Sequence, residues 1–135
     1  HAPSMPAPNP LPAGLEWLLL AVAGGAGTVA RALLTALAGR LFGTGFPWGT
    51  LAVNVLGALA FGALVGAGRS RVVLPPGVET LLLVGLLGGF TTFSSYAFQA
   101  VDLMQQGRLG AAVAYVVVSN LAGLVAVWSG MRLAA

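Results

Sequence analysis

Four long apolar stretches constrain the fold more than any other feature of this sequence. They cover about residues 15–37, 50–67, 78–104 and 111–133, and turns rich in Gly, Pro and Arg separate them. A helix of about 20 apolar residues is long enough to cross the hydrocarbon core of a bilayer. Only 7% of the residues are charged, against about 25% in a typical soluble domain. The sequence therefore predicts an all-α membrane protein with four transmembrane helices.

The amino-acid composition excludes several classes of protein. No cysteine is present, which excludes a disulfide scaffold, a thiolate metal site and a cysteine nucleophile. The basic side chains are six scattered arginines, whereas a nucleic-acid surface needs clustered basic residues. We therefore expect no nucleic-acid partner, and we expect membrane lipid around the helices.

The first 14 residues differ from the rest of the chain. They are rich in Pro and Ala and show no helical period. We predict that residues 1–14 form a disordered N-terminal extension, part of it a remnant of cloning, and that residues 15–135 form a four-helix transmembrane domain.

The third apolar stretch contains the densest polar cluster of the chain, GGFTTFSSY at 88–96. Glycine is a poor helix former, and hydroxyl side chains compete for nearby carbonyl groups. We therefore predict that the third helix is broken near the middle of the membrane. Freed backbone groups in lipid are costly unless they are buried in protein, line water or bind an ion. The break is thus a candidate site, and a kink used only for packing is the alternative.

Several other polar residues lie within the predicted spans, where polar groups are expensive and often functional. Arg31 either extends to the membrane interface or supplies a positive field for an anion. Asn54 offers amide donors that suit either an anion or a contact between helices. Tyr115 and Ser119 are four residues apart and share a helix face. With Ser94, Ser95 and Asn120 they predict a track of hydroxyl and amide groups.

Titratable groups are missing from the centres of the spans. Glu16 and Glu79 lie at the starts of spans, Asp102 lies near the end of one, and the single histidine is His1. A proton-coupled exporter needs a titratable group at mid-membrane, and a hydrolase needs a base beside its nucleophile. Neutral donors favour passive conduction of an anion. We therefore predict no catalytic residues. A small dual-topology multidrug exporter and a non-conducting membrane subunit are the alternatives.

The arginines, which normally set the orientation of a membrane protein, are distributed almost evenly between the two sides. One side carries Arg69, Arg71 and Arg132, and the other carries Arg40 and Arg108, with Arg31 added if the first helix ends near it. A chain with so little bias inserts in both orientations. We therefore predict dual topology and antiparallel pairing of two copies.

Three motifs together resemble the CrcB/Fluc fluoride channel family. They are GGAGTVAR at 24–31, GTLAVNVLG at 49–57 and GGFTTFSSY at 88–96, one for each of the first three helices and in the family's order. The resemblance covers the chain from about Leu15 onward. It implies a fluoride-selective channel of the bacterial plasma membrane that exports fluoride passively and reduces its toxicity in the cytoplasm. It also implies an antiparallel, dual-topology homodimer with two separate pores.

The same resemblance implies roles for individual residues. A structural sodium ion at the dimer interface would be held by the backbone carbonyls of Gly88 and Thr91 in both subunits. The pore would be lined by Arg31, Asn54, Phe93, Ser94, Tyr96, Tyr115 and Ser119.

The sequence departs from the family pattern at two of its positions. Tyr96 stands where the family usually has Phe, which adds a hydroxyl donor and bulk at the constriction. Gln99 stands where many members have Glu, which removes a negative charge near the path.

Overall fold

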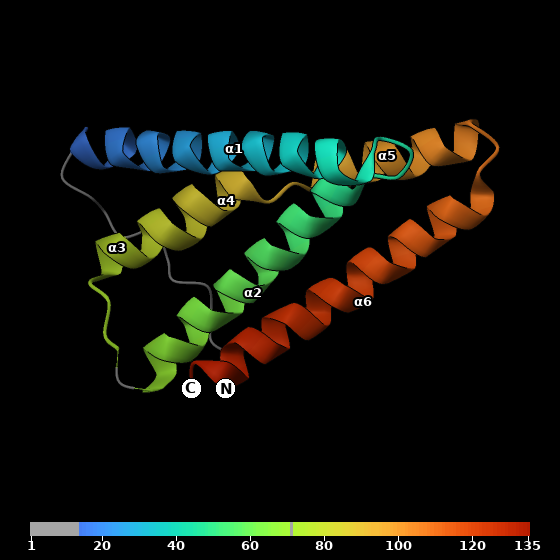
Figure 1. The fold of residues 1–135 in the computed structure, drawn as a ribbon. Helices are drawn as coiled ribbons and strands as arrows, with labels where there is room; N and C mark the ends of the chain where they lie inside the picture. The colour runs from blue at the N-terminus through green and yellow to red at the C-terminus, as the bar shows by residue number, and fades with distance from the viewer. Residues whose placement is uncertain (1–13, 71) are drawn as a thin grey trace.

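The computed structural model describes residues 14–70 and 72–135, and all the elements in this part of the chain are helices (Figure 1). The predicted extension lies outside the described residues except for Gly14, which is in a turn. The elements in chain order are α1 (Leu15–Phe42), α2 (Trp48–Ser70), α3 (Pro76–Thr80), the π-helix η1 (Leu81–Leu86), α4 (Leu87–Phe90), α5 (Phe93–Gln105) and α6 (Leu109–Leu133).

Four ranges are long and apolar enough to cross a membrane, which confirms the predicted all-helical architecture. They are Leu15–Phe42, Trp48–Ser70, Gly77–Gln105 and Leu109–Leu133. The helices run past several of the predicted ends. α1 continues through Gly39 and ends only before Gly43, whose φ of 77° is left-handed and stops the helix.

The two halves of the third span have different partners. Its first half lies along α1 through η1 and α4, whereas its second half, α5, packs against α6. Figure 1 shows this division, with the link between α4 and α5 near the middle of the span. α2 is the central helix, because it contacts α1, α4, α5 and α6.

Glycines allow α2 and α6 to lie very close together. A Cβ atom added at Gly62 would collide with the backbone of Val127, and one at Gly66 would collide with the backbone of Met131. From the other side, a Cβ at Gly130 would meet the backbone of Leu59. The face of α2 that carries Gly62 and Gly66 therefore makes a close contact with α6. Small residues at such spacing let membrane helices approach closely.

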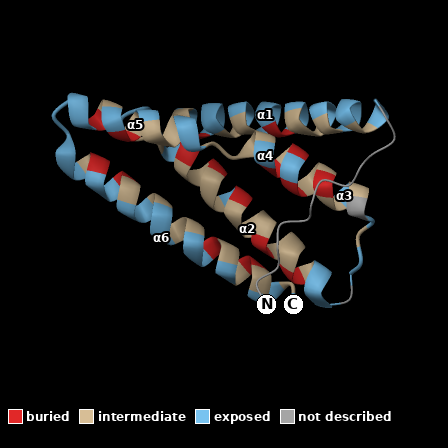
Figure 2. Ribbon diagram, turned by 180° about the vertical axis from the view of Figure 1, so that it is seen from behind, coloured by how far each residue is buried: buried red, intermediate tan, exposed pale blue. Residues whose placement is uncertain are grey.

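Few side chains are buried inside the chain. The buried share of the most apolar stretch is 6% in α1 and 22% in α2. Figure 2 shows exposed residues over most of α1 and α6, while α2 is mainly buried or intermediate. The main buried cluster contains Ala100, Leu103, Ala112 and Tyr115. Most large apolar side chains thus face outward, as expected for helices that contact lipid or another chain.

Candidate functional site

The third span is interrupted at two threonines. α4 ends at Phe90, Thr91 and Thr92 have extended backbone conformations, and α5 begins at Phe93. The Thr91 hydroxyl donates to the Leu87 carbonyl at 2.9 Å, and the Thr92 hydroxyl caps α5. The predicted break is therefore confirmed. It falls at the hydroxyl residues, and the two glycines before them remain helical within α4.

Asn54 of α2 pairs with the backbone at this break. Its Nδ2 donates to the Thr92 carbonyl at 2.9 Å, and its Oδ1 accepts from the Thr92 N–H at 2.8 Å. A backbone N–H only donates, so this pair also fixes which side-chain atom is oxygen. Of the two roles considered for Asn54, the structure shows the contact between helices. One Nδ2 proton is left for another acceptor, because a primary amide has two.

The break removes the usual helical partners of several carbonyl groups, among them those of Gly88 and Thr91. In a continuous helix the Thr92 N–H would donate to Gly88, and the Ser95 N–H would donate to Thr91. Here the Thr92 N–H donates to Asn54 and the Ser95 N–H donates to the Thr92 hydroxyl. The Gly88 and Thr91 carbonyls are thereby released from those two donors. Oxygen atoms of this kind are the ligands that hard cations prefer.

Acidic and imidazole side chains offer no alternative cation site in the described ranges. Within residues 14–70 and 72–135, no group of three His, Cys, Asp or Glu side chains could hold a metal ion. A cation at the break would therefore depend on main-chain and hydroxyl oxygen atoms.

A cavity of about 390 Å³ opens beside the break, and we call it the break cavity. It lies between α2, the end of α4 and the start of α5. Phe93 borders it with 78% of its surface exposed. Its polar and aromatic lining includes Asn54, Phe61, Thr91, Thr92, Phe93 and Tyr96.

Aromatic rings lead from the break cavity toward the buried cluster. The ring centroids of Phe93 and Tyr96 are 5.7 Å apart, and those of Tyr96 and Tyr115 are 5.4 Å apart. Asn120 donates to the Tyr96 hydroxyl at 2.8 Å. The Tyr115 side chain is fully buried, and its hydroxyl donates to Gln99 Oε1 at 2.9 Å. The two tyrosines thus each have a polar amide partner inside an apolar fold.

The remaining predicted site residues are less fully partnered. Ser94 is exposed, with its hydroxyl 3.5 Å from that of Thr92. The buried hydroxyl of Ser119 has no hydrogen-bond partner in the described part of the chain. Nε of Arg31 is also buried without a hydrogen-bond partner in that part of the chain. Arg31 does not line the break cavity, nor does it line a second cavity at the far end of α5.

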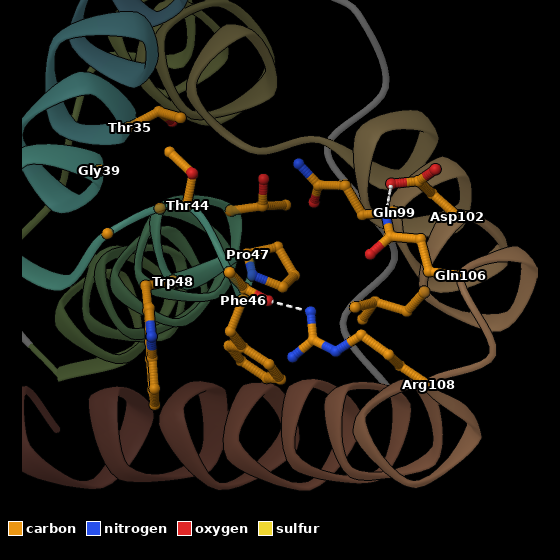
Figure 3. A pocket seen from close by; sticks show the side chains of 15 residues that line it. Thr35, Gly39, Thr44, Phe46, Pro47, Trp48, Gln99, Asp102, Gln106 and Arg108 are labelled. Carbon is orange, nitrogen blue, oxygen red and sulfur yellow. Dashed lines mark hydrogen bonds between the residues drawn. The ribbon is translucent and has the colours of Figure 1, made fainter.

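This second cavity, of about 280 Å³, lies where the α1–α2 loop meets the end of α5, and we call it the mouth cavity (Figure 3). Gln99 lines it and also binds Tyr115, so it connects the cavity to the buried tyrosines. Other polar groups of the lining are Thr35, Thr44, Thr50, Asp102, Gln106 and Arg108. A line of rings and neutral hydrogen-bonding groups therefore joins the two cavities.

The predicted site residues did not include Thr50, although the sequence carried a signal for it. Thr50 is four residues before Asn54 and so lies on the same face of α2. It is only 4% exposed and lines the mouth cavity. The polar residues of this cavity could not be grouped from the sequence, because they come from α1, α2, α5 and two loops.

Comparison with known proteins identifies the family. The family model described as CrcB-like protein, Camphor Resistance (CrcB), matches residues 18–131. The chain belongs to the CrcB family. All three motifs noted above fall inside the matched range, and so do both cavities and the break.

Curated CrcB relatives are similar over most of their length. The fluoride-specific ion channel FluC of Rhodospirillum centenum is 42% identical over 116 residues, which are 86% of this chain and 92% of the relative. FluC 1 of Symbiobacterium thermophilum is 42% identical over 120 residues, 88% of this chain and 97% of the relative. FluC of Agrobacterium fabrum is 41% identical over 115 residues, 85% of this chain and 92% of the relative.

Proposed function

We propose that this CrcB-family chain is a fluoride channel that lowers cytoplasmic fluoride by passive export through the plasma membrane. The observation that carries this proposal is the 42% identity to proteins named fluoride-specific ion channels, over more than nine tenths of their length. Four apolar spans agree with a multi-pass protein of the plasma membrane. A channel is a transporter and not an enzyme, which fits neutral donors without a neighbouring base.

The path of fluoride runs from the break cavity past Phe93 and Tyr96 to Tyr115 and Gln99, and then to the mouth cavity. Fluoride gives up strong hydration in a narrow path, so the protein must replace the donors of water. The free Nδ2 proton of Asn54 and the exposed hydroxyl of Ser94 are suited to this. Aromatic rings have a positive edge, which gives the two pore aromatics a favourable contact with a small anion.

The functional unit is an antiparallel, dual-topology homodimer. Phe93 borders the break cavity but is 78% exposed in one chain, so a second copy is needed to enclose the path. The nearly even arginine distribution supports insertion in both orientations.

A structural sodium ion would lie between the two subunits. The Gly88 and Thr91 carbonyls fit this role, because the N–H groups that would occupy them donate elsewhere. When bound, the ion would accept these carbonyl oxygen atoms as ligands and link the breaks of the two subunits. The residues Asn54 and Thr92 of this chain keep the carbonyls released.

Fluoride efflux from liposomes tests the function directly. The purified protein is reconstituted into vesicles loaded with potassium fluoride, and a fluoride electrode follows efflux after addition of a potassium ionophore. We expect rapid efflux of fluoride and no efflux of chloride under the same conditions. Uptake of a cationic dye driven by a pH gradient would instead support a drug exporter. Absence of all these fluxes would support a non-conducting subunit.

A further inference from the structure

The mouth cavity contains an arginine that the path described above does not use. Arg108 lies in the short turn between α5 and α6, and its guanidinium donates a hydrogen bond to the Gly45 carbonyl. This bond ties the α5–α6 turn to the α1–α2 loop, on the far side of the mouth cavity (Figure 3). Arg108 is exposed, and this bond holds its guanidinium at the edge of the cavity.

The positive charge of Arg108 is not neutralised by an ion pair. In the described ranges the structure shows no carboxylate within salt-bridge distance of it. Asp102 also lines the mouth cavity, but its Oδ2 accepts from Gln106 Nε2 at 2.7 Å. Figure 3 shows the Asp102 carboxylate turned toward Gln106 and away from Arg108. A guanidinium has five N–H donors, so the bond to Gly45 leaves others for a ligand.

The mouth cavity borders the proposed path at Gln99. Gln99 lines the cavity and accepts from the buried Tyr115 hydroxyl, and Thr50 lines it from α2. A small anion that leaves the tyrosines on this side thus enters a polar cavity with two charged side chains that point apart, the Arg108 guanidinium and the Asp102 carboxylate. A fixed charge in a concave site raises the local concentration of ions of opposite sign.

We propose that Arg108 is an anion-capture residue of the mouth cavity, which concentrates fluoride there, and that its bond to Gly45 fixes the charge in position. The proposal rests on the fluoride channel function proposed above. Arg108 acts through its charge, so it sets how fast fluoride enters at low concentration and low salt. It does not set the choice between fluoride and chloride, which belongs to the narrower part of the path.

The test compares Arg108→Gln with Arg108→Lys in fluoride-loaded liposomes. Arg69→Gln is the matched control, because it removes the same charge from an exposed arginine at the opposite end of α2. Salt screens exposed charges, with a Debye length of about 30 Å at 0.01 M and about 3 Å at 1 M. Efflux is therefore measured at low and at high concentrations of an impermeant salt.

We expect Arg108→Gln to slow initial fluoride efflux at low salt by roughly 3-fold to 10-fold, with the difference largely removed at high salt. Arg108→Lys and Arg69→Gln should stay within about twofold of the wild type. Equal losses in Arg108→Lys and Arg108→Gln at both salt concentrations would assign a purely structural role to Arg108 and overturn the proposal. So would an unchanged rate in a well-folded Arg108→Gln protein. A wild-type protein without fluoride efflux would contradict the channel function itself.

Discussion

The two halves of the third span use opposite means to bind their neighbours. The first half meets α1 through close contacts at Gly27, Gly85 and Gly89, where an added Cβ would collide with the facing helix. The second half meets α6 through hydrogen bonds from Asn120 to Tyr96 and from Tyr115 to Gln99, and through the tilted contact of the two tyrosine rings. Close packing leaves no room for an ion between the first half and α1, whereas the polar side chains of the second half border both cavities. The first half therefore fixes the position of the break, and the second half supplies the side chains along the proposed fluoride path.

Asn54 joins the two halves, so its substitution should have the largest effect. Asn54→Asp removes the N–H that the Thr92 carbonyl accepts and adds a negative charge beside the break cavity. An unsatisfied buried acceptor costs about 1–3 kcal/mol, and a like charge about 4 Å away repels an anion by about 4 kcal/mol. We expect fluoride efflux to fall on the order of 100-fold. Efflux within threefold of the wild type, from a protein with native helicity, would contradict this role.

Gly27→Ala should destabilise the contact between α1 and the first half of the third span through steric overlap alone. The new Cβ would collide with the Leu86 carbonyl and the Phe90 amide, both of which are backbone groups. We expect the free energy of unfolding in detergent to fall by about 1–3 kcal/mol, as measured by circular dichroism. Gly25→Ala is the matched control on the same helix, since nothing lies within 4 Å of its added Cβ. Similar stabilities of the two variants would show that the close contact is dispensable.

The sequence predicted those parts of the fold that depend on local composition. Apolar length predicted four spans, and the glycines and hydroxyl side chains of GGFTTFSSY predicted a break, which the structure places at Thr91 and Thr92. The π-helix over Leu81–Leu86 was not predicted, because its sequence LLLVGL is compatible with an ordinary helix. The end of α1 was placed too early, since glycines within a long apolar helix do not stop it unless the backbone turns left-handed.

The pairing of polar side chains could not be predicted from the sequence. Asn54 and Thr92 are 38 residues apart, and only the register of α2 against the third span brings them together. Gln99 was noted as a departure from the family pattern, but its contact with Tyr115 depends on how α5 packs against α6. Such contacts follow from tertiary packing, which no motif of this chain encodes.

Phe93→Ile tests whether the second half contributes to fluoride conduction rather than to stability. The Phe93 side chain is 78% exposed, so the fold of one chain depends little on it. Isoleucine keeps an apolar surface but lacks the positive ring edge that would face an anion. We expect fluoride efflux to fall about tenfold or more, with unchanged stability in detergent. Phe98→Ile, at a site 70% exposed on the same helix, should conduct normally. Equal efflux from both variants would remove Phe93 from the path.

Tyr96→Phe should have the smallest effect, although Tyr96 is where this chain departs from its family's usual residue. Phenylalanine keeps the ring that lies between Phe93 and Tyr115, and with it the positive edge. The lost hydroxyl is the acceptor for Asn120, but Asn120 also donates to the Val116 carbonyl at 2.7 Å and so keeps a partner. A hydrogen bond of this kind contributes about 0.5–1.5 kcal/mol. We therefore expect efflux within about threefold of the wild type and a slight loss of stability. A tenfold change in efflux would show that fluoride binds the Tyr96 hydroxyl itself, and the second half would then conduct through hydroxyl groups more than through ring edges.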